Sequence, residues 1–105
     1  MWKGPSMTAI NAIAKVRFSS GRPQRVHLVD GQRVAAELLC LERGQEMPIV
    51  GPDAMLYVIG GDATLTQDDQ TDNLSPGYLL ALENGYTLAN RDEQRLICLL
   101  FKNVS

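Results

Sequence analysis

The sequence predicts an all-β fold, a small barrel or sandwich built from about eight short strands. Turn signals rich in Gly, Pro, Asn and Asp recur roughly every 8–12 residues from Arg25 onward. Between these turns, residues 63–67 (ATLTQ) alternate apolar and polar side chains, as a half-buried strand does. This spacing favours an all-β domain over βαβ units, which need long helical segments between their strands.

A single domain accounts for the chain. It has 105 residues, of which 45% are hydrophobic, which is enough for one buried core and too little for two. We expect residues 1–20 to form an N-terminal arm and residues 21–105 to form the barrel. Residues 8–18 are ambiguous, because Thr8 could cap a short helix while residues 16–18 could instead form an edge strand.

The first half of the barrel begins with a predicted hairpin. Residues 25–30 form one strand, Asp30-Gly31 is a favoured two-residue turn, and the return strand runs to Glu42. Residues 43–53 contain two Gly and two Pro, so we expect a loop or a short irregular strand there. Residues 54–59 form the next strand.

The second half contains a polar turn and a second hairpin signal. We interpret residues 68–73 (DDQTDN) as a solvated turn, and they lack the Gly and the closing Glu of a calcium loop. Asn84-Gly85 predicts a tight hairpin. The strands predicted here lie at residues 79–82, 86–90 and 95–102.

Charge and hydropathy exclude several classes of partner. Ten Lys and Arg residues are scattered among twelve Asp and Glu residues, with a net charge of −2, so no nucleic-acid-binding surface is expected. No segment reaches the roughly 18 apolar residues that span a bilayer. The N-terminal residues lack the apolar core and cleavage site of a signal peptide. We therefore expect a cytoplasmic protein with no membrane or nucleic-acid partner.

The two cysteines, Cys40 and Cys98, each lie within an apolar run. Neither has a CxxC partner or a neighbouring His, so a cysteine-based zinc site is not expected. We interpret both as reduced thiols in the core, and a disulfide between two paired strands is the alternative.

The strand DAMLYVIGG and a set of spaced glycines form a recognisable framework over residues 25–102. Its residues are Gly44, Tyr57, Val58, Gly61, Gly77 and Gly85. This framework resembles that of the small single-domain cupins, whose two motifs share the glycines and whose first motif contains the pattern Glu-x-x-Tyr-Val-Leu-x-Gly. The resemblance implies a cupin-type double-stranded β-helix, which is a jelly-roll barrel, and it implies a homodimer.

The metal-ligand positions of the family are replaced in this sequence. Metal-binding members use three His and one Glu, which supply the nitrogen and oxygen donors that Fe, Mn, Ni or Zn require. The corresponding residues are Val50 and Pro52 (or Met47 and Ile49 if the loop is shorter), Ala54 and Leu88. None of these can bind such a cation, so we expect no metal and no cofactor, and metal-based redox chemistry loses its support.

An apolar lining in place of a metal site predicts a non-catalytic barrel. We expect the interior to be lined by Val50, Ala54, Leu56 and Leu88, with Tyr86 at one side because it shares a strand face with Leu88. Such a barrel would bind a small, mostly apolar molecule, or it would be filled by side chains and act as a structural or accessory dimeric module.

The alternative is a metal-independent isomerase or lyase that uses Tyr86, His27, Glu37 or Asp53 as acid and base. His27 is the only His, and we expect it at the surface or at a dimer contact. Glu37 lies among apolar residues, and we expect it to point outward, with an inward position as the alternative. For the dimer, we expect edge strands and an apolar N-terminal patch to supply the contact. The patch consists of Ile10, Ile13, Val16 and Phe18.

Overall fold

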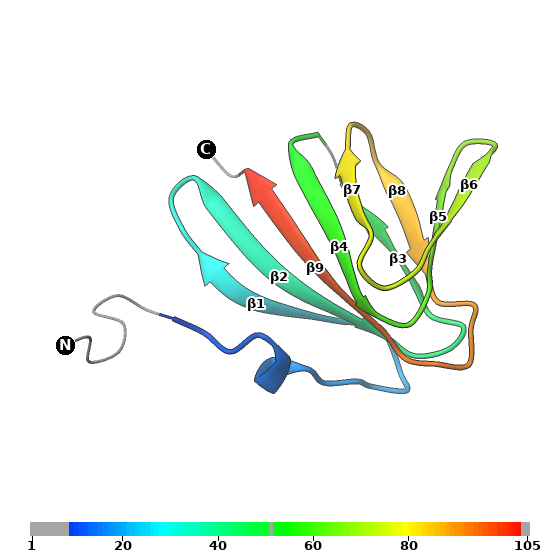
Figure 1. Ribbon diagram of the computed structural model, residues 1–105, viewed down its shortest axis with the longest axis horizontal. Helices are drawn as coiled ribbons and strands as arrows, with labels where there is room; N and C mark the ends of the chain where they lie inside the picture. The colour runs from blue at the N-terminus through cyan, green and yellow to red at the C-terminus, as the bar shows by residue number, and fades with distance from the viewer. Residues whose placement is uncertain (1–8, 51, 104–105) are drawn as a thin grey trace.

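The computed structural model describes residues 9–50 and 52–103, which form two antiparallel β-sheets packed face to face (Figure 1). The all-β prediction is confirmed, with nine strands where about eight were expected. The elements are a 3₁₀ turn η1 (Ile13–Lys15) and the strands β1 (Gln24–Asp30), β2 (Val34–Leu41), β3 (Glu46–Ile49), β4 (Ala54–Gly60), β5 (Ala63–Gln67), β6 (Gln70–Leu74), β7 (Leu79–Leu82), β8 (Tyr86–Ala89) and β9 (Leu96–Asn103).

The two sheets have the strand orders β1-β2-β9-β4-β7 and β3-β8-β5-β6. Most connections cross from one sheet to the other, so neighbouring strands in a sheet are usually distant in sequence. In the larger sheet, β9 pairs with β2 on one side and with β4 on the other. This arrangement of antiparallel strands is the jelly-roll that was expected.

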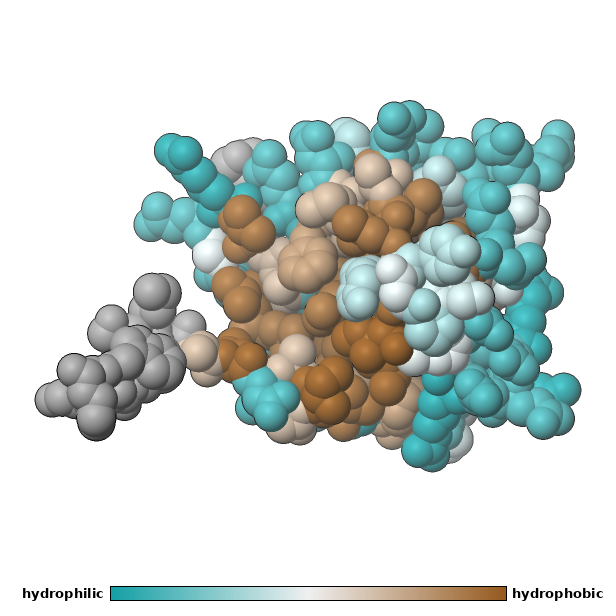
Figure 2. All heavy atoms as spheres, in the orientation of Figure 1, coloured by the Kyte–Doolittle hydropathy of each residue, from teal (hydrophilic) through white to brown (hydrophobic). Residues whose placement is uncertain are grey.

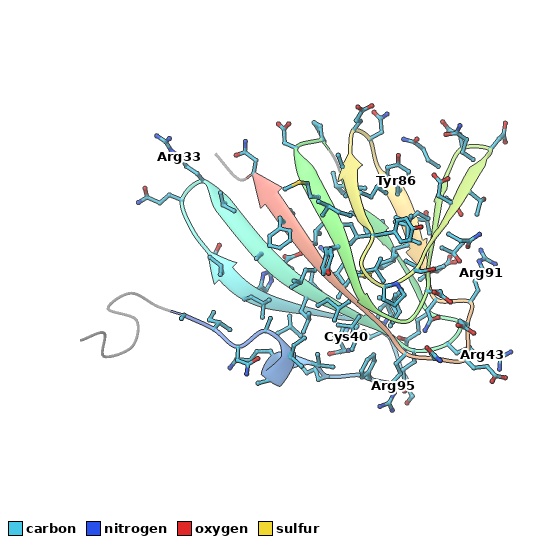
Figure 3. All side chains as sticks on the ribbon, in the orientation of Figure 1. Arg33, Cys40, Arg43, Tyr86, Arg91 and Arg95 are labelled. Carbon is cyan, nitrogen blue, oxygen red and sulfur yellow. The ribbon has the colours of Figure 1, made fainter. Side chains whose placement is uncertain are left out.

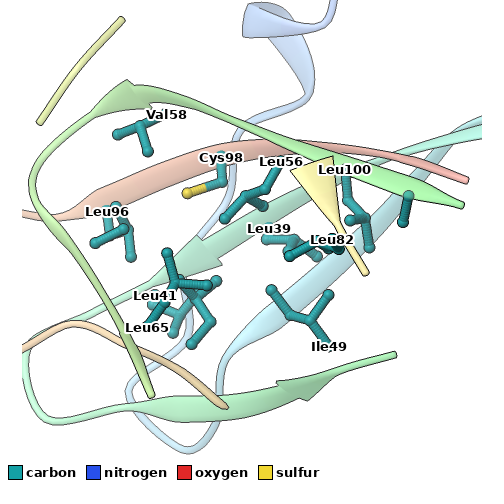
Figure 4. Close-up of a cluster of buried hydrophobic side chains, with 13 residues drawn as sticks. Leu39, Leu41, Ile49, Leu56, Val58, Leu65, Leu82, Leu96, Cys98 and Leu100 are labelled. Carbon is teal, nitrogen blue, oxygen red and sulfur yellow. The ribbon is translucent and has the colours of Figure 1, made fainter. Parts of the chain in front are cut away.

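The core lies between the sheets and consists mainly of leucines (Figure 4). Alternate residues of a strand face the same side, so in β4 the side chains of Ala54, Leu56 and Val58 point inward and are buried. The other large side chains of this core are Leu39, Leu41, Ile49, Leu65, Leu82, Leu88, Leu96 and Leu100. Side chains of both sheets therefore fill the middle of the barrel.

The outer face of the five-stranded sheet is also apolar. Here the described part of the N-terminal arm covers the β1 side, where Val16 and Phe18 pack against a buried cluster. That cluster consists of Val26, Leu38 and Cys40. Of the two expectations for residues 8–18, a short helical turn is what forms, as η1, and residues 16–18 form no strand. Thr8, the expected cap, lies outside the described residues.

The Asp30-Gly31 hairpin differs from the two-residue turn that was predicted. Asp30 pairs with Ala35 across β1 and β2, and residues 31–33 lie outside both strands. The Gly31 N–H donates to the Val34 carbonyl oxygen at 3.0 Å, which closes the longer turn. A β-bulge between His27 and Val29 shifts the register of β1 ahead of this turn.

The Asn84-Gly85 prediction was wrong about the kind of connection. This segment joins β7 to β8, which lie in different sheets, so it crosses the barrel instead of closing a hairpin. β7 pairs with β4, while β8 pairs with β3 and β5. A local turn signal predicts a reversal of direction and says nothing about which strand the chain will pair with next.

The polar run at residues 68–73 is the second correction. The turn is confined to Asp68 and Asp69, and the remaining residues belong to β6, which pairs with β5 at the edge of the smaller sheet. The first four residues of β6 are polar and exposed and only Leu74 at its end is apolar, so β6 lacks the alternation by which a strand is identified from sequence. A polar edge strand also protects the sheet from pairing with other chains.

Candidate functional site

Of the positions matched to the metal ligands of the family, Val50 and Pro52 are exposed, whereas the alternative pair Met47 and Ile49 belongs to the interior, as do Ala54 and Leu88. In β3, Met47 and Ile49 face the core and pair with Leu88 and Tyr86 of β8. Ala54 opens β4 and is buried beside them. These residues do not fit a metal ion that needs imidazole and carboxylate donors. Among the described residues there is no group of three or more His, Cys, Asp or Glu side chains that could hold a metal.

The five residues expected to line a ligand site lie at different depths. Leu56 and Leu88 are fully buried and Ala54 is 5% exposed, so their side chains belong to the packed core. Tyr86 is partly buried and packs against that core. Val50 follows β3 and is 74% exposed, which places it at the rim of the barrel. Their role in ligand binding stays a prediction.

Free space lies toward the end of the barrel where β9 ends and β4 begins. A groove of about 770 Å³, here named the β4–β7 groove, is lined by Arg33, Val34, Pro52, Asp53, Ala54, Met55, Ala81, Leu82, Glu83, Phe101, Lys102 and Asn103. A smaller cavity of about 390 Å³, the β1–β3 pocket, is lined by Arg25, Met47, Pro48, Val50, Leu100 and Lys102. Lys102 lies between the two.

A buried carboxylate is surrounded by basic side chains beside the β1–β3 pocket. Glu37 of β2 is 1% exposed. Its Oε2 lies 3.1 Å from Nδ1 of His27 and 3.2 Å from Nζ of Lys102, and its Oε1 lies 3.3 Å from Nε of Arg25. We name these four residues the Glu37 cluster. They come from three neighbouring strands, because Arg25 and His27 are in β1 and Lys102 is in β9.

The register of the larger sheet explains why these four side chains meet. Glu37 lies opposite His27 on β1 and opposite Leu100 on β9. Residues two apart in a strand share a face, so Arg25 joins His27 and Lys102 joins Leu100 on the inner side of the sheet. The Glu37 cluster therefore lies on the same inner face of the sheet as the leucine core, nearer to the rim of the barrel.

The expectation that Glu37 points outward was wrong, and its inward alternative is what the structure has. His27 was expected at the surface, and 73% of its side chain is exposed, yet its Nδ1 contacts the buried carboxylate. Among the four residues named for acid–base chemistry, the structure brings these two together. Tyr86 packs on the core and Asp53 lines the β4–β7 groove.

Arg25 and Lys102 were not identified as site residues from the sequence. An Arg and a His two apart on one strand were a weak signal, because they predict a shared basic face. What that face would meet depended on the pairing of β1 with β2. Lys102 could not be linked to Glu37 without knowing that β9 lies next to β2.

The Glu37 cluster is not a closed network. Oε1 of Glu37 is buried and accepts no hydrogen bond among the described residues, because the Nε–H of Arg25 is close enough for an ion pair but is not aligned with it. The Arg25 guanidinium donates one hydrogen bond, from Nη2 to the Pro48 carbonyl oxygen at 3.4 Å. This contact joins the edge strands β1 and β3 across the pocket.

The two cysteine thiols are free and buried, as expected. Cys40 lies on the outer face of the larger sheet and Cys98 on the inner face, because each belongs to a different core cluster. Burial raises the pKa of the Cys40 thiol and raises that of Cys98 to about 12. Neither thiol therefore provides a thiolate near neutral pH.

Comparison with known proteins places the fold. No protein-family model matches the chain, and a search of curated protein sequences found no match. Solved structures do match closely. An uncharacterized conserved protein with a double-stranded β-helix domain from Klebsiella pneumoniae superposes with a TM-score of 0.78 at 20% identity, over 96% of this chain and 88% of that one.

Two further structures carry the same fold under its usual name. A cupin superfamily protein from Desulfitobacterium hafniense has a TM-score of 0.76 at 18% identity, over 96% of this chain and 94% of its own. An RmlC-like cupin family protein from Methanocaldococcus jannaschii has a TM-score of 0.72 at 22% identity, over 95% and 93%. The chain thus has the cupin-type double-stranded β-helix fold. A fold of this kind hosts many activities and does not assign one.

No helix among the described residues is long and apolar enough to cross a membrane. The expected cytoplasmic location stays a prediction.

Proposed function

We propose that this protein is a non-catalytic binding module, a cupin-type barrel that takes up a small, mostly apolar molecule near its open end and acts as a homodimer. The observation that supports the proposal is a packed leucine core in the middle of the barrel, with free space in the β4–β7 groove. Its volume of about 770 Å³ lies within the range of small-molecule sites.

A ligand screen tests the binding function. We expect small apolar probes to shift the NMR signals of Met55 and Phe101, which line the groove. The variant Val34→Trp should abolish these shifts because it fills the groove from an exposed position on β2, away from β4 and β7. Thr87→Trp is the matched control, since it places the same side chain on an exposed position of β8. Binding that is equal in both variants would contradict the proposal.

The proposal also requires a barrel without a metal. Elemental analysis of purified, tag-free protein for Mn, Fe, Co, Ni, Cu and Zn should find far less than one metal per chain. A stoichiometric metal that survives dialysis against a chelator would contradict a metal-free module.

A second copy of this chain is the partner that the outer face of the larger sheet fits. On this face β4 presents Met55 and Tyr57, which are 45% and 37% exposed, and β7 presents Leu79, which is 58% exposed. Figure 2 shows that apolar side chains gather over β9 and β4 in the middle of this view. Apolar sheet faces of this kind are normally covered, and a two-fold contact places the same patch against itself.

Part of the apolar arm patch is already packed within the chain. Val16 and Phe18 pack on their own sheet, while Ile10 and Ile13 are 38% and 57% exposed. We therefore place the main dimer contact on β4 and β7. The paired variant Tyr57→Lys with Leu79→Lys should sediment as a monomer, while Val50→Lys, on an exposed residue outside this face, should stay a dimer. A wild-type monomer at high protein concentration would contradict the homodimer.

The contact between His27 and Glu37 favours one second candidate, a metal-independent isomerase or lyase. A carboxylate that orients an imidazole is the arrangement of a general base, and the exposed ring of His27 leaves its second nitrogen accessible. The test is exchange of solvent deuterium into a panel of sugars and keto acids at the carbon next to the carbonyl. Exchange that His27→Asn abolishes would support catalysis, and its absence across the panel would exclude it for those substrates.

A further inference from the structure

We propose that the β1–β3 pocket binds a small organic carboxylate with a short apolar body, through Arg25 and Lys102. This inference rests on the proposed binding function and names the chemistry of one ligand. The observations behind this inference are the two cations that line the pocket and the N–H donors of Arg25 that make no hydrogen bond to the described residues.

The pocket carries a positive charge that no described residue neutralises. Arg25 and Lys102 are the charged residues of its lining, and both contact the same buried carboxylate. Two permanent cations share one Glu37, so one positive charge remains uncompensated before any proton is added to His27. The side chains of Arg25 and Lys102 are 38% and 30% exposed, so both can be reached from the pocket.

Donors are also available at the same place. An arginine guanidinium has five N–H donors, and the one hydrogen bond that Arg25 makes among the described residues is 3.4 Å long. Such a length is beyond the usual range for an N–H to oxygen bond and indicates a weak contact. Of the Glu37 cluster, Arg25 and Lys102 line the pocket, so their remaining donors are available to a ligand there.

The charge balance favours a carboxylate over a phosphate. A monoanion matches the single uncompensated charge, whereas a dianion would be repelled by the carboxylate of Glu37. The planar fork of an arginine also matches the two oxygens of a carboxylate.

The remaining lining determines the body of the ligand. Met47, Pro48, Val50 and Leu100 are apolar, and together with the two cations they enclose about 390 Å³. This volume fits a short alkyl or small ring compound better than a large ligand. Val50, at the exposed rim, marks the entrance.

Titration calorimetry with hexanoate, hexan-1-ol and inorganic phosphate tests the proposal on the full chain. The two organic probes share the apolar body and differ in charge, so they isolate the contribution of the cations. We expect hexanoate to bind at least about tenfold more tightly than either of the other probes. Raising the salt concentration should weaken hexanoate binding because its partners are partly exposed.

Variants at the two rims locate the site without disturbing the core. Val50→Asp should weaken hexanoate binding about tenfold or more, because its carboxylate competes for the two cations. Val50→Asn, of matched size and no charge, and Val34→Asp, which places the same charge in the β4–β7 groove, should both bind as the wild type does. Arg25→Gln should weaken binding, and Arg33→Gln, on the other groove, should not.

The outcomes separate this inference from the proposed function. If hexan-1-ol binds as tightly as hexanoate, or if Val34→Asp abolishes binding and Val50→Asp does not, the carboxylate site is overturned while an apolar binding module stands. Tighter binding of phosphate, or no measurable binding of hexanoate, also overturns the carboxylate site. Failure of the proposed function would appear separately, as an absence of any apolar probe in the β4–β7 groove.

Discussion

The two ends of the barrel differ in how completely their polar groups are satisfied. At the closed end, where Figure 3 shows Arg43, Arg91 and Arg95, the amide of Asn90 ties two loops together. Asn90 is fully buried, donates to the carbonyl oxygens of Leu41 and Gln94 at 3.0 and 2.8 Å, and accepts from a backbone N–H at 3.0 Å. Every polar atom of this side chain has a partner.

The open end has the opposite character. Arg33 marks it in Figure 3, at the tip of the β1–β2 hairpin. The groove and the pocket lie near it, Val50 is exposed, and Glu37 keeps one buried oxygen without a hydrogen-bond donor among the described residues. The end with Asn90 also has a cavity, of about 350 Å³ and lined in part by Arg91 and Asp92, but the two larger spaces and the unsatisfied buried oxygen lie at the open end. Four substitutions or conditions test this contrast, in order of expected effect.

The largest effect is expected at Gly61, in the turn after β4 at the closed end. Its φ is +77°, and an added Cβ would lie 2.4 Å from the Arg95 carbonyl oxygen. Gly61→Ala should lower the free energy of unfolding by about 3 kcal/mol or more, measured by urea titration. Gly44→Ala is the control, because Gly44 has a φ of +83° and open space around it, so only about 1 kcal/mol should be lost. Equal losses would show that backbone conformation alone, without the clash, determines the cost.

The second effect concerns Asn90. Asn90→Ala should lower the free energy of unfolding by about 2–3 kcal/mol, because it leaves the carbonyl oxygens of Leu41 and Gln94 without the side-chain donor that they have in the folded protein. Asn84→Ala removes an exposed amide in the connection between β7 and β8 that makes no side-chain hydrogen bond among the described residues, and it should change stability little. A loss at Asn90 no greater than that at Asn84 would mean that water replaces the missing donor, and that the closed end is more open than its geometry indicates.

At the open end, Glu37→Gln should lower the free energy of unfolding by about 2 kcal/mol, because it removes the buried partner of two cations. The loss stays moderate because both cations are partly exposed, so water screens their charges once the carboxylate is gone. Chemical denaturation near neutral pH measures it. The control Glu93→Gln disrupts the ion pair with Arg43, in which both side chains are well exposed, and should have almost no effect. A neutral or stabilising Glu37→Gln would show that the buried charge is retained for binding and not for stability.

The smallest effect is a pH dependence from Cys98 in the core. Its thiol has a pKa of about 12 in the folded protein because of burial, against an ordinary value of 9.0. As pH rises above 9.0, the thiol loses its proton in the unfolded chain before it does so in the folded protein. The contribution of this thiol to stability is therefore constant below pH 9.0 and falls between pH 9.0 and about 12. The loss should reach about 1 kcal/mol by pH 10.

Denaturation curves across this pH range, compared with those of Cys98→Ala, isolate the contribution of the thiol. The same burial predicts that thiol reagents modify Cys98 slowly near neutral pH until a denaturant is added. Rapid modification of the folded protein would show that the core opens far more often than its packing indicates.

Most of the barrel could be predicted from local pattern, and the errors have a common cause. Residues 54–59 and 63–67 carry their alternation in their own side chains, so their strands were found where the structure has β4 and β5. β6 was missed because its first four residues are all polar. Asn84-Gly85 was assigned to a hairpin because a turn signal does not reveal that the chain changes sheets.

The candidate site was less predictable than the fold. The sequence indicated apolar residues where metal-binding members of the fold have ligands, and the inward positions of β3 and β8 are apolar in the structure. The Glu37 cluster was not foreseen, because it joins residues from β1, β2 and β9 that are up to 77 positions apart in the 105-residue chain, from Arg25 to Lys102. No local period connects them.

The sequence was enough to predict that this chain is all-β and that its thiols lie in apolar runs. These properties depend on residue type and on a period of two, both of which are local. Only the tertiary structure decided that Glu37 faces inward, that two cations and a histidine surround it, and that a pocket opens beside them. The physical reason is that the register between distant strands determines which side chains share a face, and that register comes from packing the whole core.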